Sequence, residues 1–242
     1  MISVDSLLYK IDQRLNKLAT NQHQAIQLED KILALQEAEI SLIKKKIDPN
    51  NLYKTGLDGF KKRYQDLQFL IENPEDHKLK PKLKDKNLNK YTADITGITP
   101  KFMFYIDSYL LADKGECKNK IVYTNPDLVK HADITLLLNN NNYKPSFEYR
   151  ETIVDISTDE ISVYSDGTFD PHSLYLSYVR YPKPVDKEGY VRFDGTDSAN
   201  QDSELESYLE DELLNLVYRD LGIYTENPSA VQGAEIKMNT EE

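Results

Sequence analysis

The sequence has few of the residues on which catalytic and metal-binding sites most often depend. It contains one cysteine, four histidines and no tryptophan among 242 residues. The single cysteine, Cys117, excludes an internal disulfide framework and a cysteine-rich zinc site. None of the histidines stands in a pattern such as HExxH, which places two metal ligands on one face of a helix. We therefore expect no bound metal and no cofactor.

Motifs for nucleophilic catalysis, nucleotide binding and membrane insertion are also missing. With only nine glycines, the chain has no glycine-rich phosphate loop, no GxSxG and no GxGxxG. It has no apolar run of about 18 residues and no basic-then-apolar leader, so we expect neither a membrane span nor secretion. His131 lies near Asp133, and residues 194–204 resemble a calcium loop whose glycine is misplaced. Both fit surface roles better, so we expect a protein that is not an enzyme.

The negative charge is concentrated near the C-terminus. The chain has a net charge of −11. Residues 194–242 hold 13 acidic residues against two basic ones, whereas residues 1–193 hold 28 of each sign. A negative protein repels phosphate groups, so nucleic-acid binding is not its expected main role. The acidic segment fits a solvated helix with a flexible tail, and it also fits an acidic surface with a function of its own.

Apolar residues recur every three or four positions in the first 72 residues, which is typical of amphipathic helices. The pattern predicts helices over residues 5–20, 26–47 and 57–72. Proline in "DPNN" (48–51) separates the second helix from the third, because proline cannot continue a helix. Short connections between such helices favour an antiparallel bundle.

A fourth helix is predicted over residues 204–221, where leucines repeat at helical spacing. Ser203 and Glu206 have capping-box spacing at its start, and Gly222 stands where a C-cap glycine is expected. Because this helix is amphipathic, it must bury its apolar face, and we expect it to return to the three N-terminal helices. The residues beyond it show no apolar periodicity and predict a flexible tail.

The middle of the chain is rich in aromatic and β-branched residues, which is typical of strands. Pro126 is expected to open a short helix that ends before "NNNN" (139–142). The lysine-rich residues 73–90 predict a solvated connector. Pro182 and Pro184 end the last strand, because proline cannot donate to a sheet ladder. The predicted strands cover residues 102–111, 119–124, 149–157, 160–164 and 172–181.

The expected fold is therefore α+β: an antiparallel helical bundle of three N-terminal helices plus a C-terminal helix, with an inserted small antiparallel β-sheet. We expect residues 1–90 to form the helical bundle and its lysine-rich linker, and residues 91–193 to form the β-rich insertion. Residues 194–223 are then the C-terminal helix returning to the bundle, and residues 224–242 are a flexible acidic tail.

The last predicted strand carries apolar or aromatic side chains on both faces. An antiparallel strand with one solvated face normally alternates apolar and polar residues. This strand must therefore be covered on both faces, either within the fold or by another subunit, and tyrosine is favoured at interfaces. The candidates for subunit contact are Tyr164, Tyr175, Val179 and Tyr181.

The stretch "LVKHADITLLLNNNNYKPSFEYRETIVDISTDEISVYSDGTFDPHSLYLSYVRYPKPVD" (128–186) resembles structural proteins of tailed bacteriophages. It is most similar to head-to-tail neck proteins of crAss-like phages. The similar features are the "HADI…LLL" helix, the strand pair ending in "ISVYSDG" and the tyrosine-rich strand ending in "RYPKPVD". Residues 28–48 and the acidic helix at residues 206–223 look similar to the same proteins, so the resemblance runs through most of the chain.

The resemblance implies a non-enzymatic virion protein, assembled in the host cytoplasm and located in the neck, at the head-to-tail interface. It forms a homo-oligomeric ring of about twelve copies, which joins the portal to adjacent neck or tail ring proteins. Genomic DNA passes through the ring without sequence-specific binding. Glu206, Glu210 and Asp211 are the acidic candidates for facing this channel or docking a partner. The alternatives are another virion component (tail tube, tail hub or minor capsid protein) and a carbohydrate-active tail protein.

Overall fold

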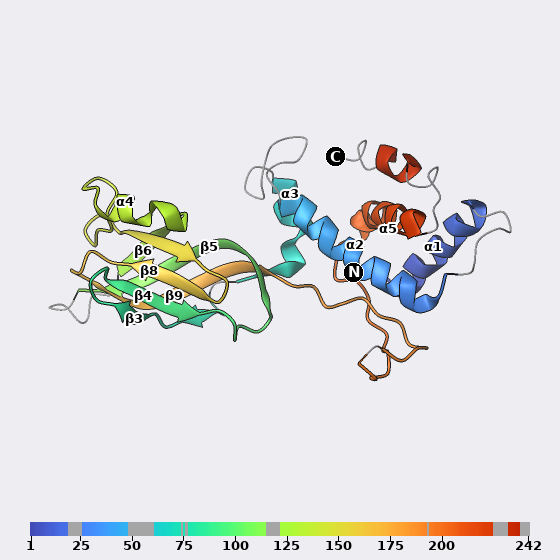
Figure 1. Cartoon of the computed structure of the whole chain (residues 1–242), viewed down its shortest axis with the longest axis horizontal. Helices are drawn as coiled ribbons and strands as arrows, with labels where there is room; N and C mark the ends of the chain where they lie inside the picture. Colours follow the sequence, from blue (N-terminus) through green and yellow to red (C-terminus); the bar gives the residue numbers. More distant parts are fainter. Residues whose placement is uncertain are drawn as a thin grey trace. The chain divides into compact units, whose positions relative to one another are not determined.

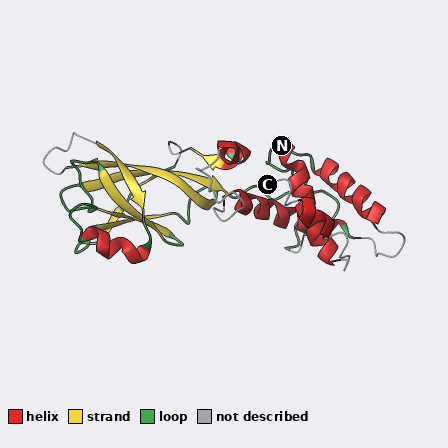
Figure 2. Cartoon of the chain, turned by 90° about the horizontal axis from the view of Figure 1, so that it is seen from above, coloured by secondary structure: helices red, strands yellow, loops and turns green. Residues whose placement is uncertain are grey.

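The chain divides into two compact units (Figure 1). The helical unit comprises Met1–Leu70 with Pro182–Glu242, and the β unit comprises Ile71–Tyr181. Figure 2 shows the strands gathered in the β unit and the long helices in the helical unit. The fold is thus of mixed α+β class. The computed structural model describes residues 1–18, 26–47, 61–73, 75, 77–114, 122–192, 194–224 and 232–237.

The helical unit is built from helices that precede and follow the β unit in the sequence. They are α1 (Val4–Leu18), α2 (Leu28–Ile47), α3 (Lys61–Asp66), the 3-10 helices η2 (Gln68–Leu70) and η5 (Ser207–Leu209), and α5 (Glu210–Tyr224), with a short helix at residues 232–237. α5 packs against both α1 and α2. Each fully buried leucine contributes about 2 kcal/mol to such packing. The buried hydrophobic residues of α5 are Leu213, Leu214, Leu216, Val217, Tyr218 and Leu221.

The first, second and fourth predicted helices are confirmed as α1, α2 and α5 over the described residues. The end of the third, predicted over residues 57–72, is wrong. α3 is followed by η2 and then by strand β1 (Ile71–Glu72), while residues 57–60 lie outside the described part. Ile71 pairs with Val179 of a distant strand, and this sheet pairing outweighs the local helical spacing.

Both cap predictions for the fourth helix are wrong. The hydroxyl of Ser203 donates to Glu39 of α2 instead of capping a helix. Glu206 is itself the N-cap residue of η5, and its side chain makes no capping bond. The helix continues past Gly222 to Tyr224, so that glycine lies inside the last turn. In the predicted flexible tail, residues 232–237 are helical.

The described part of the β unit contains nine strands, eight of which follow one continuous order. The order is β1-β9-β5-β6-β7-β8-β4-β3, and β2 also pairs with β9. All of these pairs are antiparallel except β6 with β7, which is parallel. The strands after β1 are β2 (Lys78–Leu79), β3 (Lys82–Asp85), β4 (Lys90–Asp94), β5 (Phe102–Asp113), β6 (Val122–Leu128), β7 (Glu151–Ile156), β8 (Glu160–Tyr164) and β9 (Asp170–Arg180).

The expectation of a small, purely antiparallel sheet is therefore corrected to a larger, mixed one. Pro126 does not open a helix, because it lies inside β6 opposite Thr152 of β7. The helical segment begins later, with η4 (His131–Asp133) and α4 (Ile134–Leu138). A parallel pairing between chain segments that lie far apart in sequence overrides the local preference of proline for a helix start.

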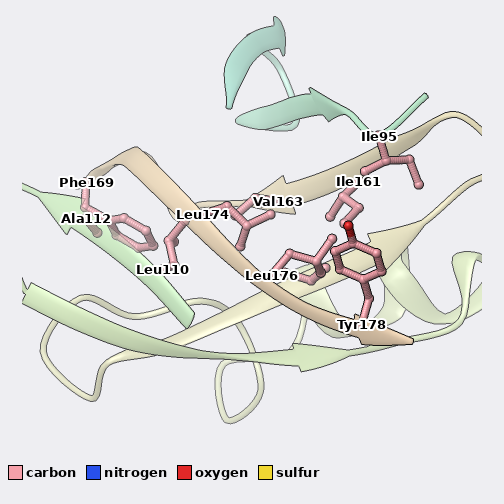
Figure 3. Packing of buried hydrophobic residues seen from close by; sticks show 10 residues of the cluster. Ile95, Leu110, Ala112, Ile161, Val163, Phe169, Leu174, Leu176 and Tyr178 are labelled. Carbon is pink, nitrogen blue, oxygen red and sulfur yellow. The ribbon is translucent and has the colours of Figure 1, made fainter. Parts of the chain in front are cut away.

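The core of the β unit is formed by side chains of strands that stand far apart in the strand order, such as β9 and β8. Leu174, Leu176 and Tyr178 of β9 are buried together with Ile161 and Val163 of β8. Figure 3 shows these side chains gathered with others from neighbouring strands. Alternate residues of β9 point into this cluster, as the period of a strand requires. The tyrosine-rich strand is therefore a central strand of the β unit.

The unit boundaries differ from the expected ones. The expected insertion was residues 91–193, whereas the β unit spans residues 71–181. The lysine-rich residues 73–90, expected to be a solvated connector, contain the strands β2 and β3. Leu79 of β2 packs against the core, which ties this segment to the β unit. Residues 182–192, which begin with the two prolines, belong with the helical unit.

Candidate functional site

Tyr175 and Tyr181 are the predicted interface tyrosines that solvent can reach. Tyr175 is half-buried and stacks on Tyr109 of β5, with ring centroids 4.6 Å apart and planes 8° apart. The ammonium of Lys78 lies 5.7 Å from the Tyr175 ring centroid. Tyr181 is 39% exposed, and the Lys101 ammonium lies 5.1 Å from its ring. Each tyrosine thus presents an aromatic surface with a cation beside it.

Tyr164 and Val179, the other two interface candidates, are covered by their own chain. Tyr164 is 2% exposed and packs with Ile134 and Ile153 in a small cluster at α4. Burial raises the pKa of its hydroxyl, with Asp155 and Glu160 adding to the effect. Val179 is fully buried. Coverage within the fold therefore accounts for the apolar character of these two positions.

The three acidic candidates, Glu206, Glu210 and Asp211, differ in exposure to solvent and in their contacts with basic side chains. Glu210 accepts hydrogen bonds from Lys10 at 2.6 Å and Ser6 at 3.2 Å, both on α1. The Asp211 side chain is 75% exposed and lies 3.7 Å from the Arg14 guanidinium. Glu206 is half-buried at the start of η5. Much of the negative charge on α5 is thus balanced by α1, and Glu206 and Asp211 are the more open of the three.

Glu39 forms a buried acidic site that the sequence did not reveal. Its side chain is 1% exposed and accepts a hydrogen bond of 2.6 Å from the Ser203 hydroxyl. Burial raises the pKa of Glu39 to about 7, the Ser203 bond opposes this rise, and the charge of Glu204 adds to it. The backbone of Ser203 pairs with Ile2, so this contact joins α2, the N-terminus and the chain segment before α5.

Lys46 connects three helices through two carboxylates. Its ammonium lies 3.3 Å from Asp66 of α3 and 2.7 Å from Glu212 of α5. The Tyr208 hydroxyl also donates to Asp66, at 2.7 Å. Burial raises the pKa of Tyr208, and the hydrogen bond to Asp66 raises it further. Because Asp66 is almost fully buried, its carboxylate depends on these partners in place of water.

Asp186 organises the loop that follows the β unit. Its carboxylate is 3% exposed and accepts hydrogen bonds from the Tyr190 hydroxyl at 2.7 Å and the Arg192 Nε at 3.1 Å. The backbone amides of Lys187 and Ala199 donate to it at 2.9 and 3.0 Å. Burial alone would raise the pKa of Asp186, but these bonds outweigh burial and lower it. One side chain thus fixes the shape of the loop.

His131 forms the acid–base pair that most resembles catalytic chemistry, but with a different partner from the predicted Asp133. Its Nδ1 lies 2.8 Å from the Oδ2 atom of Asp155 on β7. The imidazole is 77% exposed, whereas the carboxylate is 4% exposed. Ser162 is the residue opposite Asp155 on β8, and it is fully buried. The pair therefore has no accessible hydroxyl nucleophile on that neighbouring strand.

A shallow cavity of about 350 Å³ in the β unit offers little reactive chemistry. His77 lies 3.4 Å from Glu72 and packs edge-on against Tyr178. Asp94 accepts two hydrogen bonds from Thr96, which lower the pKa of its carboxyl. His77 and Asp94, the two side chains of this cavity that could act as an acid or a base, are therefore already bound to neighbouring residues. The cavity is lined by His77, Lys78, Leu79, Asp94, Gly97 and Ile98.

The remaining predicted sites are distributed as follows. Cys117 lies outside the described residues. In the calcium-like segment 194–204, Asp194 accepts hydrogen bonds from Thr196, and Asp202 accepts one from Val4. Across the part of the chain that the structure describes, no group of three or more His, Cys, Asp or Glu side chains could hold a metal. Among the described helices, none is long and apolar enough to cross a membrane.

No protein-family model matches the chain, and no curated protein matches it.

Proposed function

We propose that the chain is a non-enzymatic structural protein of a tailed-phage virion and acts as one subunit of a ring in the neck. The ring is a homo-oligomer of about twelve copies, joins the portal to the adjacent neck or tail ring, and lets genomic DNA pass. In this role α1, α2 and α3 form an antiparallel bundle with the returning C-terminal helix α5. The proposal originates in the resemblance of residues 128–186 to neck proteins.

The observation that supports assembly best is an anchored segment with exposed apolar side chains, at residues 128–150. Leu136 is 70% exposed, Tyr143 65% and Tyr149 80%. The same segment is fixed to the β unit, because Phe147 packs against the core and Ser146 pairs with Glu151. An ordered surface segment that exposes leucine and tyrosine side chains is typical of a protein–protein contact, where aromatic residues are enriched.

The channel-facing role falls on fewer acidic residues than the three predicted. Lys10 balances the charge of Glu210, so this carboxylate contributes little to an acidic lumen. Glu206 and Asp211 are more open to solvent and are the proposed channel-facing or partner-docking residues. Repulsion between their carboxylates and phosphate groups would let DNA slide without binding.

Locating the chain in purified particles tests the proposal. We expect cryo-electron microscopy of the neck to show a cyclic ring of this chain between portal and tail. Density in the tail tube, tail hub or capsid would replace the neck role by another virion role. A chain found in infected cytoplasm and never in particles would overturn both.

A pair of variants tests the anchored segment in the same particles. Tyr143→Ala combined with Tyr149→Ala should reduce incorporation of the chain into particles at least tenfold, because it removes two exposed aromatic anchors. Tyr9→Ala is the matched control, since Tyr9 is 64% exposed on α1. Equal incorporation of the double variant and the control would show that the segment is not a contact surface.

A further inference from the structure

Two surfaces of opposite charge lie on different units of the chain. Residues 78–90 of the β unit, here called the lysine segment, hold six lysines and one acidic residue, a net charge of +5. Residues 194–206 of the helical unit, here called the acidic arm, hold five acidic residues and no basic one, a net charge of −5. The two charges match in size and have opposite signs.

The lysine segment is ordered and presents its charge outward. β3 stands at the end of the strand order, so within the described chain one of its edges faces no further strand. Lys84 is bound to Glu160 at 2.6 Å. Lysines on an edge strand disfavour pairing with apolar or basic strands, and they leave an acidic segment as the fitting neighbour. The lysines that are exposed and join no ion pair among the described residues are Lys80, Lys82 and Lys86.

The acidic arm is held in place, and its carboxylates are exposed or half-buried except that of Glu204, which is buried. Its middle is tied to the Asp186 network through Ala199 and by the backbone pair of Asp186 with Gln201. The Asp197 side chain is exposed and Glu206 is half-buried, and no basic side chain among the described residues is paired with either. A held arm loses little conformational entropy on docking, which favours a specific contact over a diffuse one.

We propose that the acidic arm of one copy docks on the lysine segment of a second copy of this chain. The contact rests on the proposed ring function and names the two faces of its subunit interface. It joins different surfaces of the two copies, which is the heterologous arrangement that generates a closed ring. Nucleic acid is the less fitting occupant of the lysine segment, because the whole molecule carries a net charge of −11.

Charge reversal on each surface tests the docking by sedimentation velocity. Lys80→Glu with Lys82→Glu, and separately Asp197→Lys with Glu206→Lys, should each weaken self-association of the full chain about tenfold or more. An equimolar mixture of the two variants should associate again, because each supplies the charge that the other needs. Lys44→Glu with Lys237→Glu is the control of equal charge change on exposed lysines outside both surfaces and outside residues 128–150, and it should associate like the wild type.

Zero-length carboxyl–amine cross-linking identifies the residues in contact. In a mixture of ¹⁴N- and ¹⁵N-labelled wild-type chains, we expect mixed-isotope cross-links between the lysine segment and the acidic arm. Cross-links of a single isotope only would place the contact within one chain and overturn the proposal. Loss of DNA binding in the lysine variant, with unchanged self-association, would also overturn it in favour of a nucleic-acid surface.

These outcomes separate the docking from the proposed function. Mixed-isotope cross-links in a chain that never enters particles would support the docking and overturn the neck role. A chain located in the neck that gives no such cross-links would support the neck role and overturn the docking.

Discussion

Glu39 makes the stability of the helical unit fall as the pH rises from about 4.5 to about 7. Glu39 lies on α2, and its carboxyl contacts the Ser203 hydroxyl. The residue is 1% exposed, and burial raises the pKa of its carboxyl from 4.5 to about 7. Within this window the folded chain binds a proton at Glu39 that the unfolded chain has released. Because the folded state binds more protons, the free energy of unfolding decreases as the pH increases.

The size of the effect follows from the two pKa values. One pKa unit corresponds to about 1.4 kcal/mol, so the interval from 4.5 to about 7 corresponds to about 3 kcal/mol. Glutamine has nearly the shape of the protonated carboxyl and stays neutral. Glu39→Gln should therefore match the wild type near pH 4.5 and exceed its stability by about 3 kcal/mol at pH 8.

Urea denaturation followed by the helical circular-dichroism signal measures this difference. The free energies of unfolding of wild type and variant are compared at several pH values from 4.5 to 8, which cancels the groups that titrate equally in both. Glu37→Gln is the matched control, because Glu37 is exposed on the same helix. Its difference from the wild type should stay within about 0.5 kcal/mol at all pH values.

Two results would refute this reasoning. A Glu39→Gln variant whose difference from the wild type is constant across the pH range would mean that Glu39 is charged in the fold. A variant that is less stable than the wild type at pH 8 would mean that the carboxylate form is the one the fold prefers.

Three further substitutions test contacts on which the two units depend. Lys46→Met should destabilise the helical unit by about 3 kcal/mol in urea denaturation, because it leaves Asp66 buried without its cation, whereas the exposed Lys44→Met should cost less than about 0.5 kcal/mol. Leu176→Ala should cost about 3 kcal/mol in thermal unfolding of the β unit, against less than about 1 kcal/mol for the exposed Leu83→Ala; equal costs would contradict the assigned core. Asp186→Asn should speed tryptic cleavage after Arg192 at least tenfold, because it weakens the hold on that guanidinium, and Asp197→Asn should leave the rate unchanged.

The helices were predictable where a long apolar repeat decides the structure alone. α1, α2 and α5 follow such repeats and appear where expected. The apolar repeat also includes Ile71, but this residue pairs with Val179 in the sheet and is not helical. No local pattern contains that information, because the two residues are brought together only by the folded β unit.

The edge strand β3 was not predicted, because its sequence has no apolar repeat. The residues of β3 are exposed or half-exposed, so the strand shows no buried face from which alternation could be recognised. β3 forms its backbone hydrogen bonds with β4, whereas its sequence alone predicts a solvated connector. Sheet edges in general need few apolar residues of their own, which is why composition identifies them poorly.

The charged contacts were beyond prediction from one sequence. The sequence identified an acidic segment, but not that Lys10 balances Glu210 or that Ser203 binds Glu39. Acidic and basic residues are so numerous in this chain that any pairing is compatible with the composition. Only the packing of α1 and α2 against the C-terminal part of the chain selects these pairs.

The pairing of β1 with β9 makes the β unit a separable cassette. Ile71, its first residue, lies opposite Val179, two residues before its last. Paired Cα atoms of antiparallel strands are about 5 Å apart, so the chain enters and leaves the unit at almost the same point. A few residues could therefore bridge Leu70 and Pro182 in a chain without the cassette, and a similar bridge could close the excised cassette into a circle. A single recombination event could add or remove the whole β unit, α4 included, without changing the order of the helices in the helical unit.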